Sequence, residues 1–470
     1  MRNTKIICTI GPASEDEATL EALCRAGMNV ARLNFSHGTH EEHLERIRRI
    51  RRVREKLGLP VAIMLDTRGP EYRIKTFENG RVTLKSGDEF TFTTRDIAGD
   101  EHGVSVALDN LTQSLAVGDT ILVNNGLLSF KVKSLTETDA VCEVEEGGEL
   151  SNRKSMNFPG KVISQPYLSE QDRADIRFGV ENDVDFIACS FVSRREDLLA
   201  VRALLDEMHS SNIELIAKIE NQAGIDNIDE ICRECSGIMV ARGDMGVEVP
   251  LERLPSIQKK LITKCRLLGK RVITATEMLE SMIHNPRPTR AEASDVANAV
   301  YDGSSAIMLS GETAAGKYPV QTLKTMSRIA EQAESDIDYA ARFRTTDFRI
   351  QSTVDAISHA ACGMASDLSA RAIAVCSLSG LTVRMVSRFR PSVPVFGITT
   401  DEKTWRQLAL SWGVQPMMCD RFDSIDVLFY TAKQMARRSL APKAGETMIV
   451  TGGMTRGVSG NTNLIKVETF

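Results

Sequence analysis

The sequence has no excess of basic residues, no long apolar segment near its start and neither of the common glycine-rich phosphate loops. Its 58 Lys and Arg residues stand against 63 Asp and Glu residues, so the formal net charge is −5 and no global basic field favours nucleic acid or an anionic membrane. The first apolar stretch, Ile6–Cys8 and its neighbours, is too short for a signal peptide, which predicts a cytoplasmic protein. Neither G-x-x-x-x-G-K-[ST] nor G-x-G-x-x-G occurs, so neither motif holds a nucleotide.

Disulfide, zinc and serine-hydrolase patterns are also missing. The ten cysteines are scattered through apolar runs, and Cys232 and Cys235 form a C-x-x-C with no second Cys/His pair nearby. Helix positions i and i+3 explain that pair better than a metal site. His37, His40 and His43 drift around a helix and do not form a ligand cluster. No Ser-His-Asp arrangement is evident.

Short β-branched runs alternate with segments of helical periodicity, which is the pattern of βα units and a parallel sheet. The predicted strands are Lys5–Ile10, Asn29–Phe35, Val61–Thr67, Asp185–Val192, Glu214–Glu220, Gly237–Arg242, Arg271–Thr276 and Ala306–Ser310. Eight such strands predict a closed (β/α)8 TIM barrel, with an open doubly wound sheet as the structural alternative.

Two further segments interrupt or follow this pattern. Between Gly69 and Pro166 the sequence changes to short alternating strands with glycine turns, which predicts an inserted β-rich domain at 70–165. Residues 1–69 and 166–337 then make a barrel of close to the typical ~250 residues. Resumed βα alternation predicts a C-terminal open α/β domain at 338–470.

Polar side chains follow most of the predicted barrel strands, where the carboxyl ends converge on one mouth. Lys218 and Glu220 are two residues apart, so on a strand both point into that mouth, and Asp244 follows the next strand. Two carboxylates beside a cation suit Mg²⁺ acting on an anion, although Lys218 and Glu220 could also be only a structural ion pair. Arg32, Lys218 and Arg73 supply the positive charge that a transferring phosphoryl group or an enolate requires.

A second group of oxygen donors carries only one formal charge. It consists of Asn34, Ser36, Asp66 and Thr67. This set suits a monovalent cation better than a second Mg²⁺. A capping or turn role for Ser36 and Thr67 is an equal alternative on pattern alone.

Seven segments together resemble the pyruvate kinase family, and the match runs from Thr4 to the C-terminus. They are Ile7–Pro12, Asn29–Gly38, Leu65–Glu71, Ala217–Gln222, Met239–Asp244, Asn285–Glu292 and Met308–Thr313. The resemblance implies a barrel, a small β-barrel lid domain inserted after the third strand and a C-terminal effector domain. It implies phosphoryl transfer from phosphoenolpyruvate to ADP, giving ATP and pyruvate, in a homotetramer that uses Mg²⁺ (or Mn²⁺) and K⁺.

The resemblance also implies a role for each candidate residue. Those expected to bind phosphoenolpyruvate or act in catalysis are Arg32, Lys218, Gly243, Asp244 and Thr276. The expected Mg²⁺ ligands are Glu220 and Asp244, and the expected K⁺ ligands are Asn34, Ser36, Asp66 and Thr67. The residues expected to face the nucleotide are Asn34, His37, Arg73 and Lys154.

The turn 377–382 carries three hydroxyls around a glycine at the start of a helix. This pattern fits an ordinary helix N-cap and a phosphate site equally. The resemblance favours a phosphorylated effector, such as fructose 1,6-bisphosphate, a sugar monophosphate or AMP. The effector residues would be Ser377, Ser379, Gly380 and Thr382, with Arg456 from a later loop.

The sequence departs from the family pattern at Ala223, at Glu277 and at Asn124-Asn125. The asparagine pair lowers the negative charge of the lid domain, so this departure concerns binding of the nucleotide more than the transfer chemistry.

The rival enzyme is a barrel lyase or aldolase that acts on a pyruvate enolate, and the non-enzymatic rival is a sensor that binds phosphoenolpyruvate without turnover. Arg73 and Lys154 disfavour the lyase, since it needs no nucleotide clamp. Lys218 together with the carboxylates Glu220 and Asp244 disfavours the sensor, since binding alone needs no stabilisation of a transition state.

Overall fold

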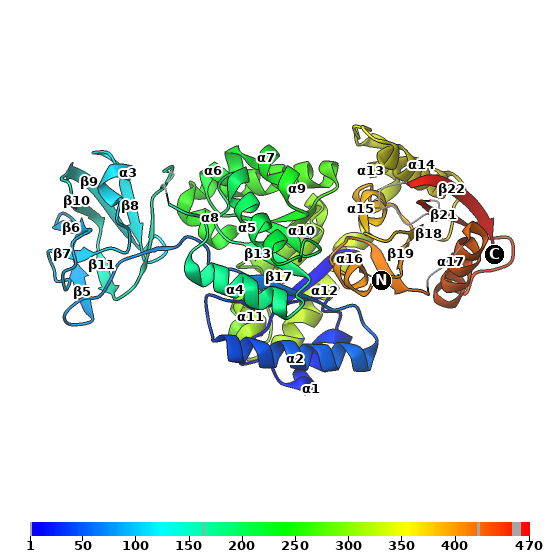
Figure 1. Cartoon of the computed structure of the whole chain (residues 1–470), viewed down its shortest axis with the longest axis horizontal. Coiled ribbons are helices and arrows are strands. Elements are labelled where there is room, and N and C mark those ends of the chain that lie inside the picture. The colour runs from blue at the N-terminus through cyan, green and yellow to red at the C-terminus, as the bar shows by residue number, and fades with distance from the viewer. Residues whose placement is uncertain (1, 162, 164, 421–423, 454–461) are drawn as a thin grey trace.

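The computed structural model of the chain describes residues 2–161, 163, 165–420, 424–453 and 462–470. Figure 1 shows three parts in a row along the longest axis: an inserted sheet at one end, a barrel in the middle and a C-terminal sheet with its helices at the other end. The predicted fold class is confirmed.

Eight strands close into the barrel in the order β1-β17-β16-β15-β14-β13-β3-β2, and all eight neighbouring pairs are parallel. Their bounds are β1 Lys5–Thr9, β2 Val30–Asn34, β3 Ala62–Asp66, β13 Phe186–Cys189, β14 Glu214–Ile219, β15 Gly237–Ala241, β16 Arg271–Ala275 and β17 Ala306–Leu309. Nearly every strand residue is buried, as expected where both faces of a parallel sheet are covered.

Helices surround the barrel, and several begin at a side-chain cap. The main ones are α1 Glu17–Arg25, α2 His40–Leu57, α4 Glu170–Glu181, α5 Arg195–Glu207, α9 Leu254–Leu268, α10 Arg290–Asp302 and α12 Pro319–Ser335. Thr39 and Glu42 form a capping box that fixes the start of α2. The arginines of α2 are not all exposed to solvent, because Arg46 and Arg54 are buried against Glu15 and Asp185.

The insertion forms a seven-stranded sheet in the order β4-β12-β8-β9-β10-β6-β7 and a two-stranded sheet β11-β5. Its strands are β4 Tyr72–Arg73, β5 Arg81–Leu84, β6 Glu89–Thr93, β7 Gly103–Ser105, β8 Thr120–Val123, β9 Leu128–Leu135, β10 Asp139–Glu146, β11 Gly148–Ser151 and β12 Ser155–Asn157. Phe90, Phe92 and Phe130 pack together in its separate core. This part of the chain therefore has a hydrophobic core of its own.

The C-terminal part has a five-stranded sheet in the order β20-β19-β18-β21-β22. Its strands are β18 Ile373–Cys376, β19 Val395–Thr399, β20 Val414–Met418, β21 Thr447–Gly453 and the antiparallel β22 Thr462–Thr469. Its helices are α14 Thr353–Asp367, α15 Leu381–Arg388, α16 Glu402–Leu408 and α17 Ile425–Leu440. The βα alternation in the sequence predicts strands at Arg371–Ser377, Val393–Thr399 and Thr447–Thr451, which correspond to β18, β19 and β21, whereas it misses β20 and β22.

This C-terminal part packs against the amino-terminal ends of the barrel strands. Arg406 on α16 bonds Asp185 at 2.7 Å, just before β13. Leu410 is fully buried among the side chains that fill the barrel interior. No helix in the described part of the chain is long and apolar enough to cross a membrane.

Candidate active site

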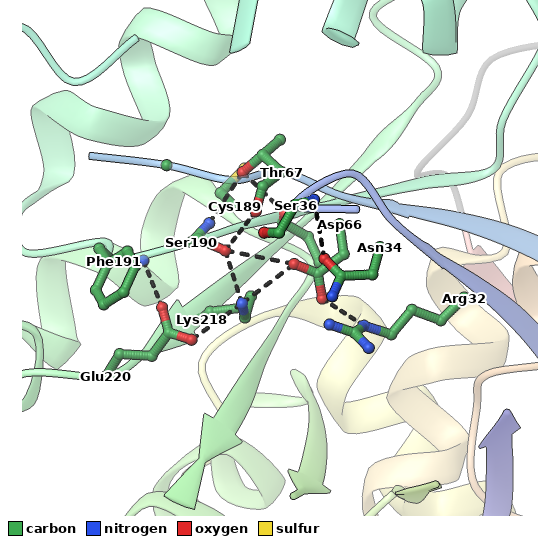
Figure 2. A network of polar contacts seen from close by, with 12 residues as sticks. Arg32, Asn34, Ser36, Asp66, Thr67, Cys189, Ser190, Phe191, Lys218 and Glu220 are labelled. Carbon is green, nitrogen blue, oxygen red and sulfur yellow. Dashed lines mark hydrogen bonds and ion pairs between the residues drawn. The ribbon is translucent and has the colours of Figure 1, made fainter. Parts of the chain in front are cut away.

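Lys218 is the centre of a buried polar network at the carboxyl ends of the barrel strands (Figure 2). Its Nζ lies 3.1 Å from Asp66 Oδ1 and 3.0 Å from Glu220 Oε1, and it donates to Ser190 Oγ at 2.6 Å. β14 brings Lys218 and Glu220 to one side, as their two-residue spacing predicts. Asp66 comes from β3 and Ser190 directly follows β13, so three separate strands build this cluster.

Arg32 adds a second cation from β2. Its Nε donates to Asp66 Oδ2 at 2.6 Å and its Nη1 donates to Thr9 Oγ1 at 2.9 Å. Asp66 therefore accepts from both Arg32 and Lys218, and although burial alone would raise its pKa, these two cations hold the pKa below its ordinary value. The carboxylate therefore fixes the positions of both cations at one side of the mouth.

The charge states of Lys218 and Glu220 depend on their mutual proximity. Burial would lower the pKa of Lys218, but Asp66 and Glu220 outweigh burial, so its pKa lies above the ordinary value and the ammonium stays charged. Burial raises the pKa of Glu220 to about 7, since Lys218 only partly compensates and Asp244 adds repulsion. Glu220 and Asp244 thus repel each other, and the Lys218 ammonium does not bring the pKa of Glu220 back to its ordinary value.

Glu220 has the features of a ligand for a hard divalent cation. Oε2 accepts from the Phe191 amide at 2.6 Å, while the buried Oε1 has no hydrogen-bond donor in the described part of the chain despite its ion pair with Lys218. Asp244 is exposed and lines the cleft beside it. Mg²⁺ takes one or two carboxylates and completes its octahedron with other oxygens, so these residues fit that ion.

The predicted K⁺ donors come from neighbouring strands. Asn34 and Asp66 are direct partners in the register of β2 and β3, and Asn34 Oδ1 accepts from the Ser36 amide at 3.1 Å. Thr67 Oγ1 donates to the Ala188 carbonyl at 3.3 Å and accepts from the Ser190 amide at 3.2 Å. The structure thus brings these oxygen ligands to one corner of the mouth, where the Thr67 hydroxyl joins the end of β3 to the end of β13.

Thr276 lies on the opposite side of the mouth, directly after β16. Thr276 and Glu277 both have left-handed backbone conformations, with φ values of 67° and 53°, which non-glycine residues adopt only at a cost. Arg242 holds this turn, because its Nη2 donates to the Thr276 carbonyl at 2.6 Å. Thr276 Oγ1 accepts from the Gly243 amide at 2.8 Å and donates to the Ala275 carbonyl at 2.6 Å.

Gly243 and Asp244 belong to α8, Arg242–Glu248, a short helix that starts where β15 ends. A Cβ on Gly243 would come within 3.6 Å of Thr276 Oγ1, so the small residue leaves the mouth open between them. The first turn of α8 therefore presents one backbone amide and one carboxylate to the same space.

A cleft of about 300 Å³ separates this mouth from the inserted sheet. Arg73 and Lys154 line it, as do Asn124 and Asn125, whose φ values of 57° and 56° form the turn between β8 and β9. Asparagine tolerates that conformation better than most residues. Arg73 pairs with Glu71 at 2.6 Å.

His37 differs from the other predicted nucleotide residues. Its side chain is exposed, and it is not among the described residues that line the cleft. His43 Nε2 donates to the His37 carbonyl at 2.9 Å, which fixes the backbone of that turn. Asn34 likewise lies in the polar network rather than along the cleft wall.

The C-terminal turn at 377–382 is built as a helix start. Gly380 has φ 69° and precedes α15, and a Cβ there would come within 3.1 Å of Leu408. Ser377 is half-buried and Ser379 is exposed, whereas Thr382 is buried and its hydroxyl bonds that of Thr462 on β22. Arg456, the remaining predicted effector residue, lies outside the described residues.

Sequence reasoning missed two members of the network. Ser190 donates to the Thr67 carbonyl at 2.7 Å while accepting from Lys218, and Phe191, with φ 56°, offers its amide to Glu220. Both follow β13. The criterion that found the other residues, a polar residue at the end of a barrel strand, applies equally to Ser190.

The fold and the site define a barrel enzyme in which anchored cations and carboxylates stabilise developing negative charge, as phosphotransferases do. The family description "Pyruvate kinase, barrel domain" matches residues 1–323, and "Pyruvate kinase, alpha/beta domain" matches residues 355–468. The chain belongs to the pyruvate kinase family. The family, the phosphotransferase class and the transfer from phosphoenolpyruvate to ADP predicted from the sequence are thereby confirmed.

Full-length relatives and a solved structure agree with this assignment. The pyruvate kinase of Clostridium perfringens is 46% identical over 472 residues, covering 100% of both chains. That of Geobacillus stearothermophilus is 47% identical over 470 residues, covering 99% of this chain and 80% of the relative. A crystal structure of a pyruvate kinase from Cryptosporidium parvum has a TM-score of 0.95 at 38% identity, covering 100% of this chain and 96% of that one.

Proposed function

We propose that Lys218 and Arg32 carry the family's phosphoryl transfer in this chain by neutralising charge on the transferring group. The single observation that carries the proposal is the charged Lys218 ammonium, held between Asp66 and Glu220 at 3.1 and 3.0 Å. In this position its charge is fixed before the substrate arrives, so little reorganisation is needed as negative charge develops. Arg32, anchored on Asp66, holds the phosphate of phosphoenolpyruvate.

Thr276 and Gly243 bind the carboxylate end of the same substrate. The Gly243 amide and the Thr276 hydroxyl already meet at 2.8 Å, and a substrate carboxylate would compete for both donors. After transfer, the Thr276 hydroxyl is placed to hold a proton on the route to the enolate carbon. Its position on a different strand from Lys218 separates the proton step from the phosphoryl step.

Glu220 and Asp244 would hold Mg²⁺ (or Mn²⁺), and Asn34, Ser36, Asp66 and Thr67 would hold K⁺. When bound, the divalent ion supplies further neutralisation of the phosphoryl and enolate oxygens. Glu220 fits this task because its buried Oε1 lacks a hydrogen-bond donor among the described residues.

We propose that residues 70–165 act as a lid domain, with 1–69 and 166–337 as the catalytic barrel and 338–470 as the effector domain. Arg73 and Lys154 line the cleft under the lid and supply positive charge for the nucleotide phosphates. Asn34 and His37, which do not line this cleft among the described residues, would contact the nucleotide only from the barrel side. Closure of the lid excludes water that would otherwise accept the phosphoryl group.

Regulation and assembly are proposed from family membership and from the C-terminal turn. Ser377, Ser379, Gly380 and the first amides of α15 would bind the phosphate of a sugar phosphate or AMP. The Thr382 hydroxyl would take part only by leaving Thr462, since the two are bonded. From family membership we also propose that the chain assembles as a homotetramer in the cytoplasm.

A coupled assay of pyruvate formation, with ADP present and then omitted, tests the proposed function. Pyruvate should form only with ADP and in step with ATP. Pyruvate formation that does not need ADP would favour a lyase or aldolase, and binding of phosphoenolpyruvate without turnover would favour a sensor. A parallel calorimetric titration of fructose 1,6-bisphosphate, glucose 6-phosphate and AMP into the parent and Ser379→Asp chains tests the effector turn. Unchanged binding in the variant would place that site elsewhere.

A further inference from the structure

A second cavity, of about 850 Å³, lies between the barrel and the C-terminal part of the chain. Its walls are α9 on one side and, on the other, the segment that leads into α14 together with the end of α15. None of the candidate catalytic, metal, nucleotide or effector residues lines it in the described structure. Its volume falls in the ~300–1,000 Å³ range of small-molecule sites.

One face of α9 forms the first wall. Lys260, Lys264 and Leu267 follow one another at spacings of four and three residues, so their side chains share one side of the helix. Leu268 extends the apolar part of this wall and is 43% exposed. Met385 on α15 faces the cavity from the opposite wall. The cavity therefore combines an apolar surface with a basic rim.

The charges around the cavity do not balance. Lys264 pairs with Asp229 at 2.5 Å and Arg388 pairs with Asp355 at 3.1 Å. Lys260 and Arg349 make no ion pair in the part of the chain that the structure describes, and Asp347 is the single lining carboxylate left without one. Two cations thus face one unpaired anion.

Arg388 supplies a buried hydrogen-bond donor in the wall of this cavity. Its side chain is only 6% exposed. Its Nη2 donates to the Arg349 carbonyl at 3.3 Å, but its Nε has no hydrogen-bond acceptor among the described residues. A buried N–H without an acceptor is costly unless something else supplies one.

We propose that this cavity binds a small organic anion that has an acidic group attached to an apolar ring. The acidic group would pair with Lys260 and Arg349 and accept from Arg388 Nε. The ring would cover Leu267, Leu268 and Met385. An inorganic anion would leave that apolar wall exposed, and a neutral apolar molecule would leave the cations unpaired. The site is separate from the catalytic mouth and from the effector turn, so the inference goes beyond the proposed function.

Calorimetric titration of the full chain with 1-naphthyl phosphate tests the inference, with inorganic phosphate and 1-naphthol as partial probes. The complete probe should bind at least tenfold more tightly than either part. The double variant Lys260→Glu/Arg349→Glu should raise its dissociation constant at least tenfold. The control Lys324→Glu/Arg177→Glu reverses one exposed lysine and one exposed arginine elsewhere on the barrel, on α12 and α4. It should bind as the parent does.

Retained turnover with phosphoenolpyruvate and ADP shows that each variant is folded and leaves the catalytic mouth intact. Equal affinity in the parent and the Lys260→Glu/Arg349→Glu chain would overturn the inference, because the probe would then bind elsewhere. No saturable binding to the parent, together with a change of oligomeric state in that variant, would also overturn it. That pair of results would identify this face as a contact between copies of the chain.

Discussion

Lys218 Nζ and Glu220 Oε1 lie 3.0 Å apart at the end of one barrel strand, and Lys218 reaches Asp66 on another strand at nearly the same distance. The lysine is therefore shared by two buried carboxylates before any substrate binds. An incoming anion meets a cation whose position is already fixed. Loss of any contact that fixes this ammonium should reduce catalysis more than it reduces stability.

Ser190 provides the first test of that expectation. Ser190→Ala removes the acceptor that lies 2.6 Å from Lys218 Nζ. A hydrogen bond to a charged group contributes about 1.5–3 kcal/mol, so kcat/KM for phosphoenolpyruvate should fall roughly 10- to 100-fold. Steady-state kinetics measure this effect, and Ser210→Ala on the far side of the barrel is the control. An unchanged kcat/KM in a folded Ser190→Ala chain would show that Ser190 does not position Lys218.

Asn157 provides a test of the lid. Its Nδ2 donates to Glu248 Oε1 at 3.0 Å, which joins β12 of the inserted sheet to the end of α8. Asn157→Asp replaces this contact with two facing carboxylates, so we expect the KM for ADP to rise about tenfold and more phosphoryl group to reach water. Asn157→Ala, which removes the bond without adding charge, should show a smaller rise. Equal effects of the two substitutions would contradict closure through this contact.

Lys5 gives a prediction about stability and pH. Its Nζ donates to the Val414 carbonyl at 2.6 Å, and burial lowers the pKa of Lys5 to about 7, with Arg2 adding to the decrease and Glu334 opposing it. Between pH 7 and the unfolded pKa near 10.4, the unfolded state binds more protons, so this group makes the folded state more stable as pH rises. Below pH 7 the full cost of the buried charge remains.

Lys5→Met removes that charge. The difference in melting temperature, variant minus parent, should therefore be greatest near pH 6. The advantage should decrease steadily by pH 9. Differential scanning calorimetry at four pH values measures the difference. A constant difference across this range would contradict the lowered pKa.

Much of the barrel could be predicted because local patterns specify it. The two-residue spacing of Lys218 and Glu220 places both on one side of a strand. The polar ends of the strands identify the mouth. Ser190 could have been found by the same criterion, whereas its bonds to Lys218 and Thr67 depend on how three strands close into a barrel. The sequence therefore predicts which residues belong to the network better than it predicts the hydrogen bonds between them.

Other features have no local signal at all. Leu410 fills the barrel interior although it lies 101 residues after Leu309, where the last barrel strand ends, and nothing in the sequence around it indicates that partner. The left-handed conformations of Thr276 and Glu277 are accompanied by a bond from Arg242, at the end of the neighbouring strand, to the Thr276 carbonyl. β22 pairs with β21 as an antiparallel edge, and its polar alternation gave too weak a strand pattern.

The Lys218→Met chain tests the central claim most directly, because it removes the shared ammonium and keeps a side chain of similar length. Two rates are measured on the same preparation: ATP formation from phosphoenolpyruvate and ADP, and exchange of the methyl protons of pyruvate with solvent. We expect ATP formation to fall at least a thousandfold, in line with loss of about 4 kcal/mol of charge stabilisation. Proton exchange should fall much less, because the proposed function assigns it to Thr276, which lies after a different strand. Near-normal ATP formation, or an equal fall in both rates, would contradict the role assigned to Lys218.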